Sequence, residues 1–410
     1  MISRFRQIEI EDAREETVSR EYVRQVVKCM AFFEFASKDE MFSKLMPTFL
    51  RDYGIMKWEQ YPLAFLSVVA LTGFKEGIVN FDNLQTVTQD CCRKAIDRVS
   101  VAYDEVIPKK ENPDYKAFRE RPMIKISDKE YFISNVGFTV GKIYDSLYFQ
   151  FLDYYLKEGG NGKRFLQHYT TEFSEGKLLS QTVKKICGNQ YDVTLDDPAC
   201  SIINSKVSSP PDFYIRSGNM VILFELKDIK VKAWTREYGS VEDYASFFYE
   251  HLVYDGKRKI GVSQLLRQIK RIQSNDFVWD KGCPKDSWIY PVIVLADYRQ
   301  TASGLKNLLN VWMREEAAKE HMSLDNVGSV ILMDLATLMV YAENFGRDGF
   351  VTYFDDYYAR SEFKENGIIG EDALTNATMS FSDYINHQRC YGMKKWLEVF
   401  IGCLKKAGIQ

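Results

Sequence analysis

Apolar residues in the first third of the chain recur at helical spacing, and those in the middle third form shorter runs typical of strands. The helical spacing predicts helices over Glu21 to Phe35, Lys38 to Tyr53, Tyr61 to Thr72 and Phe81 to Val106. Short strands are predicted from Pro122 to Ser134. A helix with many aromatic residues on one side is predicted from Gly137 to Leu156.

Helices followed by a hairpin are also the order of a winged-helix module, in which the helix before the hairpin enters a DNA groove. The helix predicted from Phe81 to Val106 offers few basic residues beyond Arg93, Lys94 and Arg98. A helical scaffold or partner-binding domain is therefore the favoured interpretation. The aromatic side of the helix from Gly137 to Leu156 is expected to pack between domains, with a base-stacking platform as the alternative.

Helical and strand patterns alternate after the glycine-rich stretch GGNGK at residues 159–163. Helices are predicted over Glu172 to Cys187, Val241 to His251, Gly261 to Ser274, Gly304 to Glu320 and Ala336 to Asn344. Strands are predicted over Tyr191 to Leu195, Trp288 to Ala296 and Val327 to Leu335. This order predicts an α/β fold in which helices cover a mixed sheet.

The clearest strand pattern is a hairpin between Asp212 and Leu226. Two runs rich in β-branched and aromatic residues flank Gly218 and Asn219, and a two-residue loop of this kind is typical of a tight hairpin. One face of the hairpin is expected to be buried and collects Phe213, Ile215, Met220, Ile222, Phe224 and Leu226. The other face carries acids and a lysine.

The hairpin loop also predicts which residues face each other. If Ser217 faces Met220, Asp212 lies opposite Glu225, with Cβ atoms roughly 5 Å apart. Lys227 points to the same face as Glu225, because side chains alternate along a strand. Two facing carboxylates repel each other, and a hard divalent cation such as Mg²⁺ between them removes this conflict.

The sequence Pro211-Asp212, followed by Glu225-Leu226-Lys227 at a strand end, resembles the PD-(D/E)xK nuclease superfamily. The resemblance implies that Asp212 and Glu225 bind a metal, with the backbone carbonyl of Leu226 as a further ligand, and that Lys227 assists the attack of water on a phosphodiester. The implied metal is Mg²⁺, and Mn²⁺ is expected to substitute for it. The alternative is a half-exposed hairpin with a surface salt bridge between Lys227 and a carboxylate.

Two more residues match places that the resemblance assigns to the active site. Glu175 precedes Leu178 and Leu179 on the apolar side of its predicted helix, and a Glu from the first core helix completes the metal site in the superfamily. The alternative for Glu175 is a favourable interaction with the helix dipole. Gln264 matches a glutamine on the helix after the catalytic strand.

Four basic residues are candidates for contact with nucleic acid. Arg267 and Arg271 follow Gln264 by one and two helical turns and could bind phosphate through two hydrogen bonds each. Lys257 and Arg258 belong to a basic cluster in the excursion after the hairpin. For all four, a solvated charged surface is the alternative.

These patterns give a four-part organisation around a restriction-endonuclease-like, mixed-sheet α/β core. The parts are a helical N-terminal domain (1–120), a hairpin and aromatic helix that link it to the core (121–163), the nuclease core (164–346) and a mostly helical C-terminal segment (347–410). The resemblance covers about residues 165–345.

Composition limits the class of protein without identifying it. The chain has 410 residues, 46% of them hydrophobic, which is enough for more than one core. The net charge of −3 disfavours a protein that coats DNA non-specifically, so contacts with nucleic acid depend on local patches. Eight cysteines without a C-x-x-C pair and only four histidines disfavour a zinc site and suggest buried free thiols in a reducing cytoplasm. No apolar run reaches the length of a membrane span, so no membrane contact is expected.

The expected function is therefore metal-dependent hydrolysis of phosphodiester bonds in nucleic acid, with DNA favoured over RNA. The order of domains suggests a prokaryotic restriction, repair or antiviral-defence effector. A double-strand break needs two active sites, which suggests a homodimer, and the lack of an ATPase motif assigns any motor or sensor to a separate protein. The alternative is a non-catalytic nucleic-acid-binding or assembly protein built on the same fold.

Overall fold

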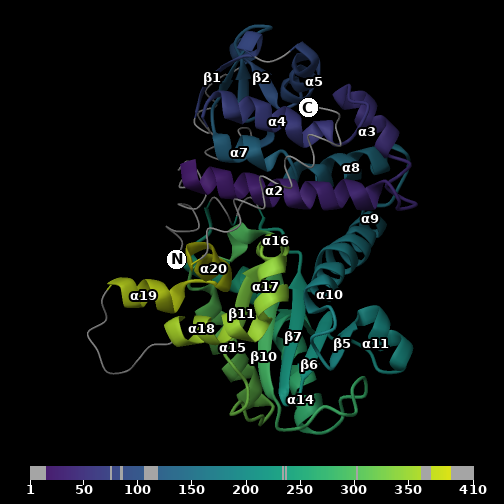
Figure 1. Cartoon of the computed structure of the whole chain (residues 1–410), viewed down its shortest axis with the longest axis vertical. Helices are drawn as coiled ribbons and strands as arrows, with labels where there is room; N and C mark the ends of the chain where they lie inside the picture. Colours follow the sequence, from purple (N-terminus) through teal and green to yellow (C-terminus); the bar gives the residue numbers. More distant parts are fainter. Residues whose placement is uncertain are drawn as a thin grey trace. The chain divides into compact units, whose positions relative to one another are not determined.

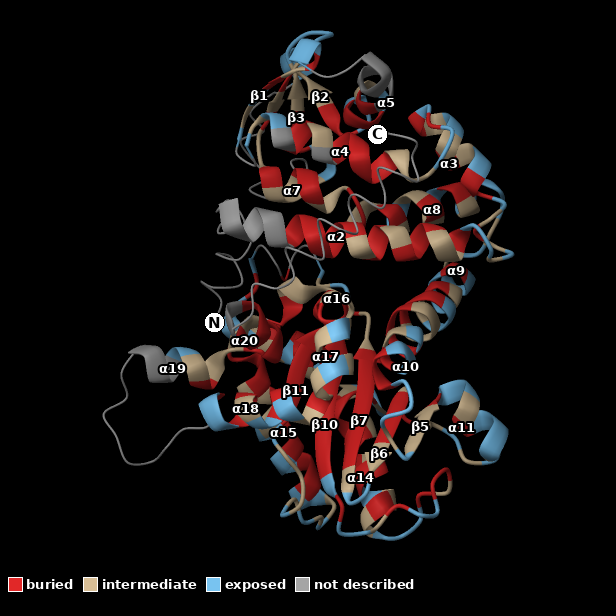
Figure 2. Ribbon diagram, in the orientation of Figure 1, coloured by how far each residue is buried: buried red, intermediate tan, exposed pale blue. Residues whose placement is uncertain are grey.

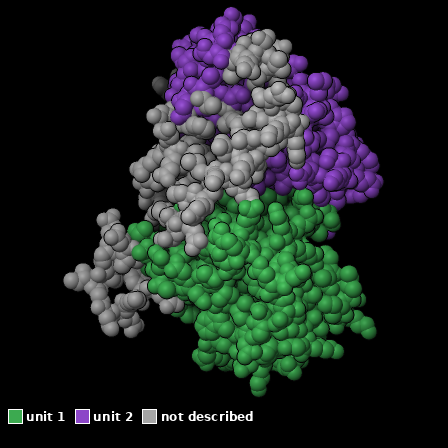
Figure 3. All heavy atoms as spheres, in the orientation of Figure 1, with its two compact units in different colours: residues 1–5, 170–390 green, residues 6–169, 391–410 purple. Residues whose placement is uncertain are grey.

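The computed structural model describes most of the chain, and the described residues form two compact units. The described residues are 15–73, 76–83, 86–105, 119–232, 235, 238–301, 303–361 and 371–388. Residues 15–169 form one unit and residues 170–388 the other (Figure 3). They are called the N-terminal unit and the C-terminal unit below.

The N-terminal unit combines helices with a small four-stranded sheet. Its helices are α2 (Glu15–Ala36), α3 (Met46–Tyr53), α4 (Gln60–Leu71), α5 (Thr86–Asp97), α7 (Val136–Gly141), α8 (Asp145–Lys157) and α9 (Gly162–His168). Its strands are β1 (Gly77–Asn80), β2 (Ser100–Ala102), β3 (Met123–Lys125) and β4 (Glu130–Ile133), in the order β1-β4-β3-β2. The predicted hairpin between Pro122 and Ser134 is thus confirmed. It pairs with β1 and β2, so it belongs to this unit and does not form a separate linking segment.

The region predicted as one helix from Phe81 to Val106 is broken into shorter elements. It contains the 3-10 helices η1 (Phe81–Asn83) and η2 (Tyr103–Glu105) as well as α5 and β2. The Phe81 N–H donates to the Lys129 carbonyl next to β4, and β2 pairs with β3. Pairing with other strands therefore overrides the local helical pattern. Val106 lies outside the described residues.

Two other predicted helices are shorter than expected, because side chains bind backbone groups at their ends. The helix predicted from Lys38 begins only at Met46, since the Asp39 carboxylate accepts the N–H groups of residues 41 and 42. The helix predicted from Gly137 to Leu156 divides into α7 and α8. At the break, the Gln25 side chain accepts the N–H groups of residues 144 and 145.

The aromatic side of α8 belongs to the core of the N-terminal unit. The Phe151 ring lies 4.9 Å from that of Phe32, 5.9 Å from that of Phe42 and 5.4 Å from that of Phe49, measured between centroids. Phe151 is fully buried. The packing interpretation is therefore correct for this residue, but the partner surface lies within the same unit.

The C-terminal unit is built on a five-stranded mixed sheet (Figure 1). Its strands are β5 (Val193–Asp196), β6 (Phe213–Ser217), β7 (Met220–Lys227), β10 (Trp288–Leu295) and β11 (Ile331–Asp334). They lie in the order β11-β10-β7-β6-β5. β10 is parallel to β7 and β11, whereas β6 is antiparallel to β5 and β7. The predicted mixed α/β class is confirmed at this level.

The hairpin formed by β6 and β7 has the predicted register. Ser217 pairs with Met220, and the ladder continues to Phe213 and Phe224. Gly218 takes a positive φ of 54° in the two-residue loop, a conformation that glycine adopts without steric cost. The loop therefore sets which side chains meet at the far end of the hairpin.

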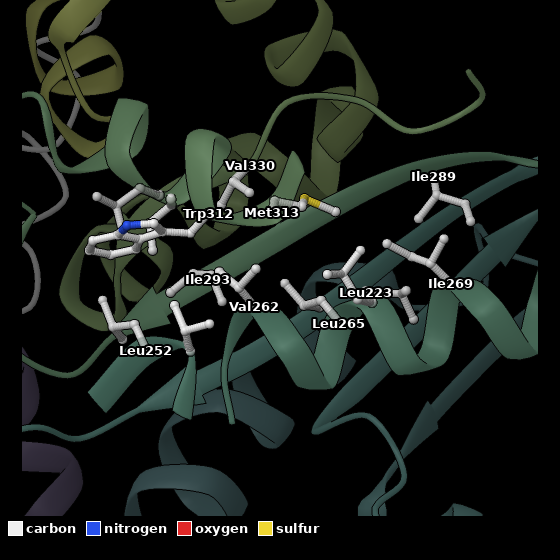
Figure 4. Close-up of a cluster of buried hydrophobic side chains, with 14 of the residues drawn as sticks. Leu223, Leu252, Val262, Leu265, Ile269, Ile289, Ile293, Trp312, Met313 and Val330 are labelled. Atoms are coloured by element: carbon white, nitrogen blue, oxygen red, sulfur yellow. The ribbon is translucent and has the colours of Figure 1, made fainter. Parts of the chain in front are cut away.

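Both faces of the hairpin are covered, although only one was expected to be. On the face of Leu223 lies α14 (Val262–Gln273), whose Leu265 and Ile269 pack on the sheet (Figure 4). On the opposite face, the Phe224 ring contacts that of Phe350, with 5.5 Å between centroids. Figure 2 shows β7 and β10 as almost entirely buried. β7 lies between the parallel strand β10 and the antiparallel strand β6, so it is inside the sheet, where helices cover both sides.

The remaining helices of the C-terminal unit surround this sheet. They are η3 (Tyr169–Ser180), α10 (Gln181–Cys187), α11 (Asp197–Ile203), α13 (Val241–Leu252), α15 (Leu305–Lys319), η4 (Tyr298–Gln300), α16 (Leu335–Val340), α17 (Ala342–Asp348), α18 (Phe350–Ser361), α19 (Glu371–Thr378) and α20 (Phe381–Gln388). A small hairpin joins β8 (Tyr254–Asp255) to β9 (Arg258–Lys259). Because Phe350 and Phe354 of α18 pack on β7 and β10, the described part of the segment predicted as a separate tail belongs to the core.

Two observations concern the expectations from composition. Among the residues that the structure describes, five cysteines are buried free thiols, as predicted: Cys29, Cys92, Cys187, Cys200 and Cys283. Among the described residues, no helix combines the length and the apolar character needed to cross a membrane.

We expect Ile269→Ala to destabilise the C-terminal unit by about 2–5 kcal/mol, because it leaves a cavity between α14 and the sheet. Lys270→Ala is the matched control on the same helix. It removes an exposed ion pair with Glu320 and should cost no more than about 1 kcal/mol. Urea denaturation of the full chain measures both, and equal midpoints for the two variants would contradict the packing described above.

Candidate active site

The acids predicted to bind a metal lie at one edge of the sheet, where β6 begins and β7 ends. Asp212 directly precedes β6, and extending the observed ladder by one residue places it opposite Glu225. The Leu226 N–H donates a hydrogen bond of 2.6 Å to Oδ2 of Asp212. This bond holds the Asp212 carboxylate against the end of β7.

Lys227 joins the same cluster through Glu225. Its Nζ donates to Oε1 of Glu225 over 2.6 Å. Glu225 is only 1% exposed, and the Lys227 side chain is 19% exposed. The salt bridge considered in the alternative reading of the hairpin does exist, but it is buried. Burying an ion pair costs free energy of desolvation, so the salt bridge between Lys227 and Glu225 is not an ordinary surface interaction.

Glu175 reaches the cluster from η3. Its carboxyl interacts electrostatically with Asp212 and Lys227. The predicted α-helix from Glu172 to Cys187 is correct only from Gln181 onward, because Tyr169–Ser180 forms a π-helix. π-helical turns are rare and occur frequently at functional sites.

Side chains tie the middle and the C-terminal end of η3 to the sheet edge. The Ser174 hydroxyl donates to Oδ2 of Asp228, directly after β7, over 3.3 Å. The Ser180 hydroxyl and the Lys184 ammonium donate to Oδ2 of Asp196, over 2.6 Å and 2.5 Å. Asp196 is the last residue of β5. The helix that carries Glu175 is therefore tied to the ends of two strands.

Burial and the charges of neighbouring acids raise the pKa values of Glu175, Asp212 and Glu225. Burial, and then the charge of Asp212, raise the pKa of Glu225 and that of Glu175 to about 8 each. Burial also raises the pKa of Asp212, although Lys227 and the Leu226 N–H act in the opposite direction.

The pKa of Lys227 is raised as well. Burial alone would lower it, but the charges of Glu225 and Asp212 outweigh this effect. Lys227 therefore stays an ammonium group at neutral pH. Its single positive charge does not neutralise all three carboxyls once they are ionised.

The chemistry of the donor set suits a hard divalent cation. Carboxylate oxygens are preferred ligands of Mg²⁺, and burial followed by the charge of Asp212 makes ionisation of Glu175 and Glu225 unfavourable without a further cation. In the described part of the chain, no group of three or more His, Cys, Asp or Glu side chains is arranged to hold a metal ion. Oxygens of Asp212 and Glu225 instead accept hydrogen bonds from Leu226 and Lys227.

The other predicted site residues lie on α14 and on the small hairpin. Gln264 caps its own helix, since its Oε1 accepts the Gly261 N–H over 3.0 Å. Arg267 is partly exposed on the same helix. Lys257 and Arg258 are exposed in the hairpin of β8 and β9. Roles in catalysis or nucleic-acid binding stay predictions for these four residues.

Arg271 has contacts that the sequence did not suggest. Its guanidinium donates to the backbone carbonyls of Ser208 and Ser209, over 3.2 Å each. These residues belong to the loop that leads into Asp212. The predicted phosphate contact therefore competes with bonds inside the protein.

Sequence reasoning missed two acids near the cluster. Asp197 and Asp228 both contribute to the raised pKa of Glu175. A signal was present, because β5 runs in the same direction as β7, so that residues after both strands reach the same edge of the sheet. Asp228 also follows Lys227 directly in the sequence.

We expect Glu175→Gln to stabilise the metal-free protein at alkaline pH. An ordinary glutamate ionises with a pKa of 4.5, whereas Glu175 in the folded chain has a pKa of about 8. Its ionisation therefore costs stability progressively between these values, and the variant should gain up to about 5 kcal/mol at about pH 9 and less than about 1 kcal/mol at about pH 5. Thermal unfolding with EDTA measures this difference. Glu172→Gln, an exposed change in the same helix, is the control, and a gain that does not grow with pH would contradict the crowding of carboxyls.

Comparisons with known proteins yielded no match. No family model, no curated protein and no solved structure matches the chain. The functional conclusion therefore depends on the geometry and chemistry of the site.

Proposed function

We propose that this chain is a metal-dependent nuclease that hydrolyses phosphodiester bonds of nucleic acid, with DNA as the favoured substrate. One observation carries the proposal. Asp212 and Glu225 face each other at the matched ends of two strands, and Lys227 and Glu175 join them in a largely buried cluster with too little positive charge.

The order of elements around the cluster supports a restriction-endonuclease-like fold. A helical segment carrying Glu175 precedes β5, the hairpin of β6 and β7 supplies the motif, and α14 connects onward to the parallel strand β10. Pro211-Asp212 and Glu225-Leu226-Lys227 are the residues that carry the resemblance to the PD-(D/E)xK superfamily. The proposal therefore includes membership of that superfamily.

The acids would hold the cofactor of the reaction. Asp212, Glu225 and the Leu226 carbonyl would bind Mg²⁺, and Glu175 would complete the site. When bound, Mg²⁺ supplies Lewis-acid polarisation of the phosphate and lowers the pKa of water. The three carboxyls bind it only when ionised, so their raised pKa values favour activity at neutral to alkaline pH.

Lys227 would act as a cation and hydrogen-bond donor. Because its pKa is raised, it keeps its proton at neutral pH and does not serve as the general base. Its Nζ would orient the attacking water and offset negative charge on the phosphorus centre. The water oxygen forms a bond to phosphorus, the bond from phosphorus to one sugar oxygen breaks, and the products are a phosphate monoester and a hydroxyl group.

Contacts outside the cluster would position the substrate. Arg267, Lys257 and Arg258 are the exposed or partly exposed basic residues proposed to contact phosphates. A double-strand break would need a second active site from a second copy of the chain. A role in restriction, repair or antiviral defence, together with a separate motor or sensor protein, is part of the same proposal.

Purified protein should cut circular DNA in the presence of Mg²⁺ or Mn²⁺ and not with EDTA. Asp212→Asn and Lys227→Met should each lower the rate by about 100-fold or more, because they remove a metal ligand and the charge at the phosphate. Glu172→Gln, an exposed acid in the same helix as Glu175, should stay within about twofold of the unchanged protein. Gel assays on circular double-stranded DNA, single-stranded DNA and RNA measure the rates and identify the substrate.

Thermal unfolding of each variant shows whether a loss of cutting reflects loss of the fold. If the folded, unchanged chain cuts none of these substrates and calorimetry detects no Mg²⁺ binding, the nuclease proposal is wrong. The non-catalytic binding or assembly protein would then be the better interpretation.

A further inference from the structure

A loop directly before Asp212 is held by two side chains of α14. Nε2 of Gln268 donates to the Ser209 carbonyl over 2.7 Å. Nη1 and Nη2 of Arg271 donate to the carbonyls of Ser209 and Ser208, over 3.2 Å each. Three donors from one helix therefore hold two consecutive carbonyls of the loop.

The two side chains are themselves fixed in place. Nη1 of Arg271 also donates to Oε1 of Gln268 over 3.1 Å, so the pair is linked. The guanidinium lies over the ring of Trp279, 5.0 Å from its centroid, and Trp279 is buried. Gln268 is only 1% exposed. An arginine that is stacked and bonded in this way is pre-organised for its acceptors.

The loop has a conformation that needs such support. Ser209 takes a positive φ of 58°, which residues with a side chain adopt only at a cost. Pro210 and Pro211 follow, and their fixed φ angles transmit the direction of the chain to Asp212 with little freedom.

The helix that provides the donors is a firm reference. On its other side, Leu265, Ile269 and Ile272 are buried in the core beneath the sheet. The same sheet carries Glu225, so α14 connects the loop before Asp212 with the strand that carries Glu225. Movement of the loop relative to β7 would separate the Asp212 carboxylate from the Leu226 N–H.

On the basis of the proposed nuclease function, we infer that Gln268 and Arg271 are positioning residues. They set the Asp212 carboxylate opposite Glu225 by holding the Ser208 and Ser209 carbonyls. This role replaces the phosphate contact predicted for Arg271, since its donors already bind the backbone.

The test compares Arg271→Lys with Lys270→Ala in the full chain. A lysine keeps the positive charge but cannot bind two carbonyls with a planar fork. Misplacement of a metal ligand should raise the Mg²⁺ concentration for half-maximal cutting about 10-fold and lower kcat by about 10–100-fold, with KM for DNA changed by less than about twofold. Lys270→Ala removes a neighbouring charge that pairs with Glu320, and it should leave all three quantities unchanged.

The opposite pattern would overturn the inference. If Arg271 contacts phosphate, Arg271→Lys should keep nearly full activity. Arg271→Ala should then raise KM and weaken the salt dependence of binding, with kcat retained. If the Arg271 variants do not fold, Gln268→Met removes the bond to Ser209 with little change in volume. It should reproduce the change in Mg²⁺ dependence in weaker form, by about threefold or more, and an unchanged Mg²⁺ dependence would contradict the inference.

A second readout separates this inference from the nuclease proposal. Hydrogen exchange followed by mass spectrometry reports on the Leu226 N–H, which is bonded to Asp212. Arg271→Lys should speed exchange in peptides that contain Leu226 by about 10-fold or more, and Lys270→Ala should not. Inactivity of the unchanged chain would count against the nuclease function and leave the positioning role untouched. Unchanged exchange in Arg271→Lys would reject the positioning role even if the chain is active.

Discussion

Repulsion among buried carboxyls is the constraint on which the rest of the C-terminal unit depends. Glu175, Asp212 and Glu225 share one small region, and Lys227 supplies a single ammonium group within it. Isolated carboxyls of this kind would move apart or toward solvent. They stay together because strand pairing, the anchors of η3 and the packing of α14 leave their backbones little freedom. The packing of the apolar sheet therefore offsets the electrostatic cost of holding these carboxyls close together.

Three structural restraints together explain the geometry of the cluster. The two-residue loop at Gly218 sets the register of β6 and β7, and that register alone brings Asp212 opposite Glu225. The parallel strand β10 then places β7 inside the sheet, so Glu225 is buried. Glu175 is brought to the same edge by a helical segment whose side chains bind Asp196 and Asp228.

The sequence was informative where local rules decide the structure. Alternation and the loop type predicted the hairpin and its register, because both depend on neighbouring residues. The burial of the second face, where Leu223 packs against Leu265 and Ile269, could not be predicted from the hairpin, since the covering helix α14 lies elsewhere in the sequence. The role of Arg271 was also hidden, because its acceptors are backbone carbonyls, which every residue has and which leave no pattern in the sequence.

The energetic cost of the cluster favours a functional interpretation over a structural one. A single buried ion pair between Lys227 and Glu225 is at best weakly stabilising, and two further acids beside it make the folded state less stable as pH rises. Neutral amides of the same shape would fit the same places without this penalty. Groups that reduce stability in a well-packed core are typical of sites where charge is used in binding or catalysis. The geometry that confines Asp212, from the loop at Ser209 to the Leu226 N–H, serves the same use, since a metal ligand is effective only where its position is fixed.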